Sequence, residues 1–255
     1  MNISRLARPL CSLKLAAPDG LRLLDSFISP SEQEAIATQV AHIFRSARKI
    51  CHAAQAEKAH IPQPASVKSL AHNLSSDEYY VPLKMELEPG SASGSAYFPK
   101  YGDEGHELMY FSKGTVQSLP PFAKDFIYSK MPALSPLVSV EGKWRLTLNH
   151  YTPQGVQQER ASSPATRPGF PYHKDLPANG DVTMILTLQA RGDMELVPET
   201  DPHRSPSQVL LHPGSLLVLS GEARWRWLHR LRPVPDEKQR MSVVFGWRGP
   251  QAAHG

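Results

Sequence analysis

The chain has 255 residues, a length that predicts one domain with an N-terminal addition. Its 28 Lys and Arg residues against 24 Asp and Glu residues give a formal net charge of +4, which permits a polyanionic partner without requiring one. No apolar run approaches the ~20 residues of a membrane-spanning helix, so no membrane partner is predicted. Cys11 and Cys51 lie in no metal-binding motif, which excludes a thiolate metal site and favours a reducing, intracellular compartment.

Residues 1–18 form a basic N-terminal segment. It carries Arg5, Arg8 and Lys14 but no acidic residue. Three of its leucines fall on one helical face, a pattern that resembles a mitochondrial presequence. A frayed basic terminus explains the same residues equally well, so a mitochondrial location and a cytoplasmic or nuclear location both stay open.

Residues 19–143 are expected to contain two helices. The run Ser29-Pro30-Ser31-Glu32 combines an N-cap, a proline at the first helical position and a capping-box glutamate, so it predicts the start of a helix. A second helix is predicted from Pro120 to Lys130. Residues 60–118, between them, carry aromatic side chains that either pack in the core or stack on a nucleobase, and the core is the favoured expectation for most of them.

A series of short strands occupies the C-terminal half. From Trp144 to Tyr151, apolar residues alternate with polar ones, and this places Asn149 and Tyr151 together on one face. Short apolar runs follow at residues 182–188, 194–197, 209–211 and 216–219, with turn signals between them. This spacing predicts a mainly β fold, an antiparallel sandwich or barrel.

The candidate metal ligands are His173, Asp175 and His229. Residues two apart on a strand point to the same side, so His173 and Asp175 can reach one metal ion. Two imidazoles and one carboxylate are the ligand set of a non-haem Fe(II) centre, which leaves positions open for other ligands. His203 and His212 are rival distal ligands, but each lies beside a proline in a turn-like segment, whereas His229 falls on the aromatic face of a strand predicted over residues 225–231.

Several arginines are expected near this site. Arg240 and Ser242 share one face of the last predicted strand with Arg248, and a guanidinium there can hold a carboxylate bidentately. Four more arginines are expected on the outer face of the His229 strand, either as a phosphate-contact surface or as a solvated face: Arg224, Arg226, Arg230 and Arg232.

The order of four motifs resembles the AlkB-like branch of the 2-oxoglutarate/Fe(II) dioxygenases: Asn149-His150-Tyr151, His173-Lys174-Asp175, His229 and Arg240. The resemblance implies a double-stranded β-helix (jelly-roll) core over residues 144–250, with N-terminal helices packed on it and a substrate-recognition lid within residues 19–143. It also implies Fe(II), 2-oxoglutarate and O2, with the two histidines and the aspartate as the catalytic metal ligands. Four residues are then expected around the cosubstrate: Asn149, Tyr151, Arg240 and Ser242.

One position departs from the pattern of that family, which places a second arginine six residues after the first. Gly246 stands there, and Arg248 follows two residues later. A bulge at Gly246 would bring Arg248 back to the cosubstrate as a second anchor. Without a bulge, the second anchor is missing or another group takes its place, so Arg240 with Ser242 is the stronger prediction for the distal carboxylate.

The leading functional prediction is oxidative demethylation of an N-alkylated nucleic-acid base. The alternative within the enzyme class is hydroxylation or demethylation of a protein side chain, so an alkylated nucleic acid and a protein are the two expected partners. A non-catalytic jelly-roll binding module is a third alternative, favoured by the departure at Gly246 and opposed by the intact set of metal ligands. The sequence predicts no oligomeric state.

Overall fold

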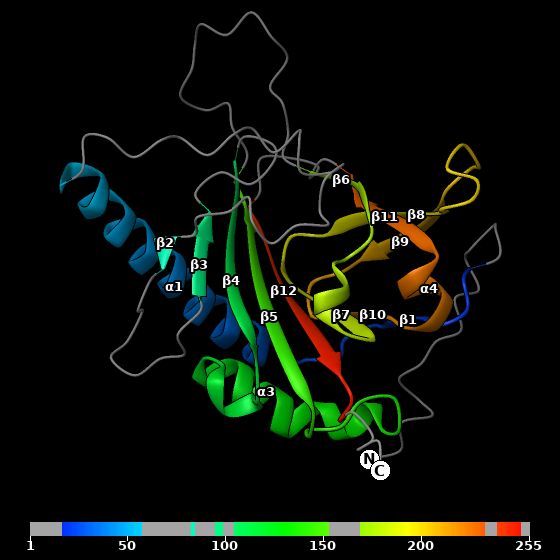
Figure 1. The fold of residues 1–255 in the computed structure, drawn as a ribbon, viewed down its shortest axis with the longest axis horizontal. Coiled ribbons are helices and arrows are strands. Elements are labelled where there is room, and N and C mark those ends of the chain that lie inside the picture. The colour runs from blue at the N-terminus through cyan, green and yellow to red at the C-terminus, as the bar shows by residue number, and fades with distance from the viewer. Residues whose placement is uncertain are drawn as a thin grey trace, which may run out of the picture.

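Two antiparallel sheets form most of the protein in the computed structural model, which describes residues 17–57, 83–84, 95–98, 105–152, 169–232 and 239–250 (Figure 1). The larger sheet has the strand order β1-β10-β7-β12-β5-β4-β3-β2, and the smaller has the order β6-β11-β8-β9. The larger sheet consists of β1 (Leu21–Leu24), β2 (Leu83–Lys84), β3 (Ser95–Phe98), β4 (His106–Gly114), β5 (Lys143–Tyr151), β7 (Val182–Gln189), β10 (Leu216–Leu219) and β12 (Arg240–Arg248). The smaller sheet consists of β6 (Phe170–His173), β8 (Gly192–Pro198), β9 (Ser207–Leu211) and β11 (Trp227–Leu231).

The eight strands from β5 to β12 form a jelly roll. Apart from the β8–β9 hairpin, each successive strand changes sheet, and the last strand, β12, pairs with the first, β5. The orders β10-β7-β12-β5 and β6-β11-β8-β9, with every pair antiparallel, are those of a double-stranded β-helix. The predicted mainly β, jelly-roll fold class is therefore confirmed by the strand pairing of this chain.

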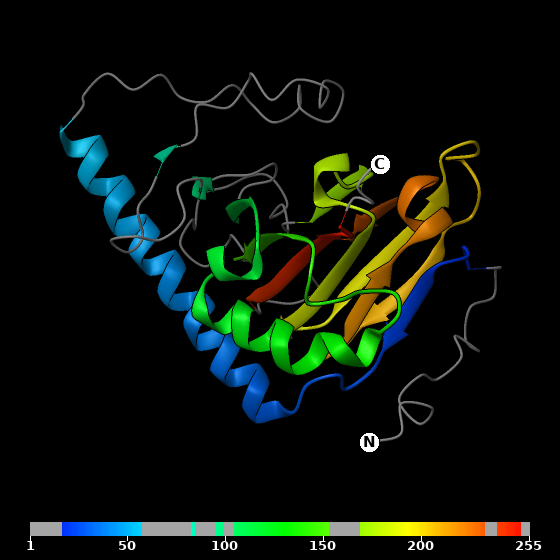
Figure 2. The same cartoon turned by 60° about the horizontal axis from the view of Figure 1, so that its bottom comes forward.

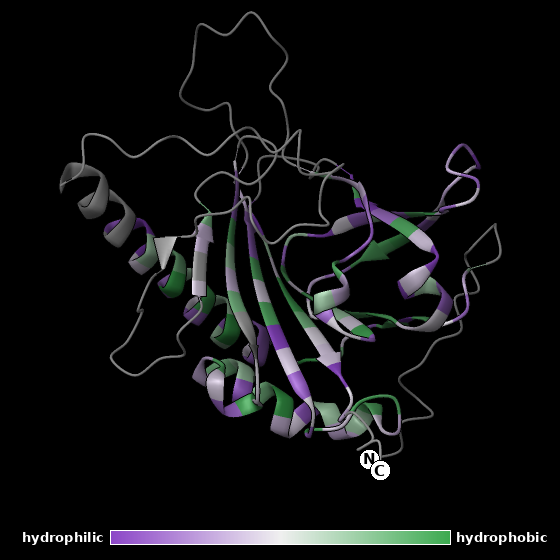
Figure 3. Cartoon of the chain, in the orientation of Figure 1, coloured by the Kyte–Doolittle hydropathy of each residue, from purple (hydrophilic) through white to green (hydrophobic). Residues whose placement is uncertain are grey.

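Strand alternation divides the larger sheet into an outer and an inner face. On β5, the apolar side chains of Trp144, Leu146 and Leu148 belong to the core on the outer face, and Figure 3 shows the alternating bands along this strand. A second core, which includes Ile185 and Leu196, fills the space between the two sheets. Asn149 and Tyr151 lie on the inner face, as predicted, because they fall out of phase with the apolar residues of the same strand.

Two helices cover the outer face of the larger sheet, α1 (Pro30–Glu57) and α3 (Pro121–Lys130), as Figure 2 shows. The predicted capping box is present: the Ser29 amide donates to the Glu32 carboxylate over 2.8 Å, and the Glu32 amide donates to the Ser29 hydroxyl over 3.3 Å. Phe126 of α3 stacks on Phe245 of β12 with ring centres 4.8 Å apart. Three 3₁₀ turns and one short helix complete the described elements: η3 (Val116–Ser118), η4 (Met131–Leu134), η5 (Pro177–Asn179) and α4 (Gly221–Trp225).

Parts of the N-terminal half lie outside the described residues. These are residues 1–16 of the basic segment and, within the predicted lid, residues 58–82, 85–94 and 99–104. Two aromatic residues of the lid that are described, Tyr97 and Phe111, are buried in the core, as expected. Among the described helices, none has the length and apolar character that crossing a membrane requires.

The prediction for residues 224–226 is wrong. They do not extend the His229 strand, because Gly221–Trp225 forms the helix α4 and β11 begins only at Trp227. This turn buries Arg224 to 2% exposure and leaves Trp225 39% exposed. The expected outer row of four arginines is broken as well, since Arg230 and Arg232 both pair with the buried carboxylate of Glu195.

Candidate metal centre

Strand pairing brings His173, Asp175 and His229 together. Strands β6 and β11 lie side by side (Figure 1). His173 ends β6 and is the direct partner of His229 on the antiparallel strand β11, while Asp175 follows two residues after His173. The two imidazole rings have centres 4.3 Å apart, and the Asp175 Oδ2 atom lies 3.9 Å from His229 Nε2. One ligand atom from each residue lies within 4.8 Å of the other two, and no other such cluster of three occurs in the described part of the chain.

The protonation states of the three side chains suit a divalent cation. Burial, with a smaller effect of His229, lowers the pKa of His173 to about 3, and burial also lowers the pKa of His229. Burial alone would raise the pKa of Asp175, but the charges of His229, His173 and Arg224 outweigh it and lower this pKa. Neutral imidazoles and an ionised carboxylate are the forms that bind metals, so no proton has to leave at neutral pH.

The ligand orientation also fits a metal. The His173 Nδ1–H donates to the Pro171 carbonyl over 2.8 Å, so the lone pair of this ring is on Nε2. Asp175 Oδ2 is buried and has no hydrogen-bond partner. A buried, unpartnered carboxylate oxygen is costly, and a bound cation would satisfy it. Two nitrogen donors and one carboxylate oxygen on one side fit Fe(II).

Arg240 lies buried on the inner face of the larger sheet without an acidic partner among the described residues. It is 1% exposed, and its guanidinium donates to the hydroxyls of Ser242 (3.2 Å) and Thr187 (3.5 Å). Its Nε has no partner, and burial lowers the pKa of the group. A buried cation whose only described hydrogen-bond acceptors are neutral hydroxyls is chemically suited to pair with an anion.

The predicted cosubstrate residues surround this guanidinium. Arg240 pairs with Tyr151 in the β12–β5 register, and Ser242 pairs with Asn149. The Arg240 guanidinium carbon lies 5.5 Å from the centre of the Tyr151 ring. Thr187 joins the group from β7, where it is the partner of Ser242. The structure therefore brings four of the five predicted cosubstrate residues together, all except Arg248, and adds Thr187.

His106 connects the arginine to the metal ligands, and it was not predicted. Its ring stacks on Tyr151 at 4.1 Å, and its Nε2 lies 3.0 Å from the Asn149 side-chain oxygen. Phe170 packs edge-on against both His106 and His173, at 5.6 Å and 4.2 Å. Pairing of β4 with β5 creates this layer, and a single histidine in a chain with 11 of them gives no local signal for it.

The expected role of Arg248 is not supported. The β12–β5 register runs without a break from Arg240 to Arg248, so this pairing has no bulge at Gly246 to bring Arg248 back towards the cosubstrate. Eight strand residues span about 26 Å, which separates Arg248 from Arg240. Arg248 donates instead to the Pro177 carbonyl over 2.8 Å. At Gly246 a Cβ atom would lie 2.3 Å from the Asn179 carbonyl oxygen, so close packing rather than a bulge explains the glycine.

Arg224 is the second buried guanidinium near the metal ligands. It donates to the backbone carbonyls of Asp175 (2.9 Å) and Leu176 (2.6 Å). These bonds fix the segment that presents the Asp175 carboxylate, and the positive charge contributes to the low pKa of that carboxylate. The sequence pattern predicted this arginine on the outer surface, and the turn into α4 is what places it inside.

No family model matches the sequence, and no curated protein matches it. Solved structures with similarity include a rice dioxygenase for auxin oxidation, with a TM-score of 0.48 and 15% identity over 91% of this chain and 74% of that chain. A prolyl-4-hydroxylase of Pseudomonas putida has a TM-score of 0.47 and 13% identity over 96% of this chain and 98% of that chain. OsALKBH1 has a TM-score of 0.43 and 15% identity over 91% of this chain and 100% of that chain.

These similarities are too distant to assign a subfamily or a substrate. Two of the names refer to different chemistry, oxidation of auxin and hydroxylation of prolyl residues, and the AlkB-like name is one among several. The strand order of this chain therefore defines its fold class, and the positions of its side chains define the candidate metal centre.

Proposed function

We propose that this chain is an Fe(II)- and 2-oxoglutarate-dependent oxygenase. The observation that carries the proposal is the combination of the His173–Asp175–His229 cluster with the buried guanidinium of Arg240 inside one jelly roll. A metal site alone suits many proteins. An anion site joined to it by the packed rings of Tyr151, His106 and Phe170 suits a cosubstrate that carries a carboxylate at each end.

Each residue then has a defined task. His173, Asp175 and His229 would hold the iron, which when bound would supply oxidation by O2: one oxygen atom enters the substrate C–H bond and the other enters the succinate formed, with CO2, from 2-oxoglutarate. Arg240, with the hydroxyls of Ser242 and Thr187, holds the distal carboxylate. If the His106 Nε2–H donates to Asn149 Oδ1, the Asn149 amide NH2 is left to donate to the cosubstrate.

For the substrate class, we propose an N-alkylated nucleic-acid base; oxidation of an N-methyl group on such a base releases formaldehyde. Oxidation of a protein side chain is the second candidate. The arginines near His229 favour this candidate, because they do not form the phosphate-contact surface that a nucleic-acid substrate would use. Arg224 is buried, and Arg230 and Arg232 both pair with Glu195. The third candidate, a non-catalytic jelly-roll binding module, is disfavoured because the three metal ligands and the buried Arg240 are all present.

The test combines metal binding with turnover. The purified chain is expected to bind one Fe(II) and to release succinate in a substrate-dependent way when screened against methylated oligonucleotides and peptides. His173→Ala and Asp175→Ala are expected to lose both properties, whereas His212→Ala, at an exposed histidine remote from the cluster in sequence, serves as the matched control. Unchanged iron stoichiometry in both ligand variants would contradict the assignment of the metal centre.

A further inference from the structure

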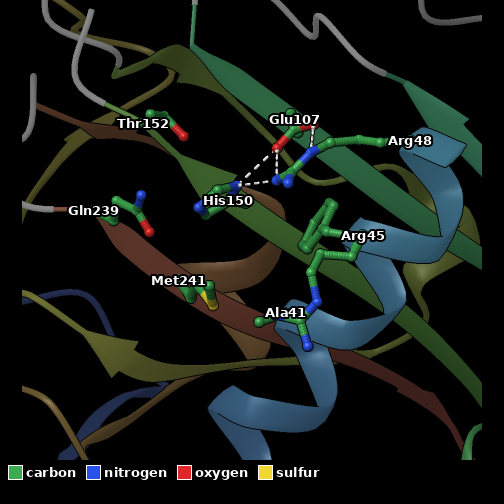
Figure 4. A pocket seen from close by; sticks show the side chains of 9 residues that line it. Ala41, Arg45, Arg48, Glu107, His150, Thr152, Gln239 and Met241 are labelled. Atoms are coloured by element: carbon green, nitrogen blue, oxygen red, sulfur yellow. Dashed lines mark hydrogen bonds and ion pairs between the residues drawn. The ribbon is translucent and has the colours of Figure 1, made fainter. Parts of the chain in front are cut away.

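A cavity of about 370 Å³ lies on the outer face of the larger sheet, between α1 and the strands β4, β5 and β12 (Figure 4). His150, between Asn149 and Tyr151 on β5, and Met241, between Arg240 and Ser242 on β12, are among its lining residues. Because successive strand residues point to opposite faces, the cavity and the Fe(II)/cosubstrate region are on opposite sides of the same two strands. We call it the outer cavity.

The Glu107 carboxylate in the outer cavity already accepts four hydrogen bonds from protein groups. Glu107 accepts two hydrogen bonds from Arg48, over 2.8 and 2.6 Å, one from His150 Nδ1 over 2.7 Å, and one from the Tyr97 hydroxyl. Burial would raise the pKa of Glu107, but these bonds prevail and lower the pKa to about 2. Glu107 is therefore an anion that compensates the charge of Arg48 and has little capacity to bind anything else.

The remaining polar groups of the cavity are mainly hydrogen-bond donors. Arg45 is exposed and has no acidic partner among the described residues, and in Figure 4 no interaction joins it to the Arg48–Glu107–His150 group. His150 is 5% exposed; because its Nδ1–H donates to Glu107, the unpartnered Nε2 of the neutral ring is a hydrogen-bond acceptor. The Thr152 and Gln239 side chains lie on the opposite side of the cavity from α1. Among the described residues, the positive charge of Arg45 is thus uncompensated, and the Thr152 hydroxyl and the Gln239 amide can add two hydrogen-bond donors.

The rest of the lining is apolar. Phe44 is completely buried, packs against the His150 ring at 5.4 Å and, with Ala41 and Met241, supplies a hydrocarbon surface beside the donors. A cavity of a few hundred Å³ that combines apolar walls with a few convergent polar groups has the size and composition of a small-molecule site.

We propose that the outer cavity binds a small organic anion, a carboxylate or phosphate group on an apolar body, at a site separate from the metal centre. Arg45 forms the ion pair with the anionic oxygens, Thr152 and Gln239 add hydrogen bonds, and the apolar body packs against Phe44 and Met241. Arg48 and Glu107 hold His150 in place rather than binding the anion themselves. The proposal does not depend on the assignment of the oxygenase activity.

The test is calorimetric titration of the metal-free chain with phenyl phosphate and with benzoate, at low ionic strength. Saturable binding at one equivalent per chain is expected, with the two probes distinguishing a phosphate from a carboxylate preference. Arg45→Gln is expected to weaken binding about tenfold, because a charge-assisted pair is replaced by a neutral hydrogen bond. Arg22→Gln, at an exposed arginine on β1, is the matched control and should bind as the unmodified chain does.

A further variant identifies the site. Arg240→Gln removes the buried guanidinium on the inner face and is expected to leave phenyl phosphate binding intact. Absence of saturable binding for both probes, equal affinity in Arg45→Gln and the unmodified chain, or loss of binding in Arg240→Gln instead would each overturn the proposal. A Thr152→Val variant, which keeps the shape of the side chain, should weaken binding several-fold and thereby place the anion near the end of β5.

Discussion

Replacement of Arg240 by methionine is expected to have opposite effects on cosubstrate affinity and on protein stability. In the cosubstrate-free protein, the guanidinium is 1% exposed and donates only to the neutral hydroxyls of Ser242 and Thr187. A buried charge without a counter-ion is destabilising, and its replacement by a similarly sized apolar side chain is expected to stabilise the free protein by about 1–4 kcal/mol.

The same change removes both hydrogen bonds of a bidentate pair with the distal carboxylate of 2-oxoglutarate. Bonds to charged groups contribute roughly 1.5–3 kcal/mol each, so the loss of two corresponds to about 10²- to 10⁴-fold weaker binding. Arg240→Lys keeps the charge but not the two-pronged geometry, and about a tenfold loss is expected.

The assay is succinate release at varied 2-oxoglutarate and varied primary substrate, together with thermal unfolding of each variant. The KM for 2-oxoglutarate should rise far more than the KM for the primary substrate. Arg248→Met, at the other end of β12, is the matched control and should leave the KM for 2-oxoglutarate unchanged. An equal rise in both KM values, or a destabilised Arg240→Met protein with normal cosubstrate affinity, would refute the reasoning and make Arg240 a structural residue.

Three other variants test the surroundings of the site. Arg224→Lys cannot serve both carbonyls, of Asp175 and Leu176, so Fe(II) affinity measured by equilibrium dialysis is expected to fall about 10- to 100-fold, while Arg226→Lys, at the exposed neighbouring position, should have no effect. Glu107 has a folded-state pKa of about 2, below its ordinary value of 4.5, so its stabilising contribution is complete above about pH 4.5 and is lost as the pH falls towards 2. Glu107→Gln should therefore lower the free energy of unfolding by about 2 kcal/mol at neutral pH, after allowance for solvent screening, and a difference of the same size persisting at pH 2 in urea titrations would contradict this origin. Gly246→Ala places a Cβ atom 2.3 Å from the Asn179 carbonyl oxygen, and the forced backbone shift is expected to cost about 1–3 kcal/mol in urea unfolding; an unchanged midpoint would show that the contact relaxes freely.

Local patterns in the sequence predicted those features that depend on neighbouring residues. The capping box at Ser29 and Glu32 forms because its donors and acceptors are three residues apart. The alternation from Trp144 to Tyr151 predicted which side chains face the core, since the pleat of a strand fixes this whatever its partner is. The choice of His229 over His203 and His212 also followed from its place on a strand rather than in a turn.

Long-range pairing determined the features that the sequence did not predict. A strand pattern gives the face on which a side chain lies, but not which strand lies beside it. The β4–β5 pairing therefore stacks His106 on Tyr151, a contact that no local sequence pattern predicted. The unbroken β12–β5 register likewise separated Arg248 from Arg240.

Arg240 and Arg224 illustrate the difference between what strand alternation predicts and what only the tertiary structure decides. Arg240 was predicted to face the cosubstrate because strand parity holds throughout β12 and puts it on the same face as Ser242. Arg224 was predicted on the outer surface by the same parity, but residues 221–225 turn into a short helix, where parity no longer applies. The sequence by itself determined most strands of the C-terminal half, the faces of β5 and β12, and the metal-ligand types. Only the tertiary structure decided that a helical turn would place the Arg224 guanidinium against the Asp175 and Leu176 carbonyls, because that position depends on where β11 packs against β6 and β8.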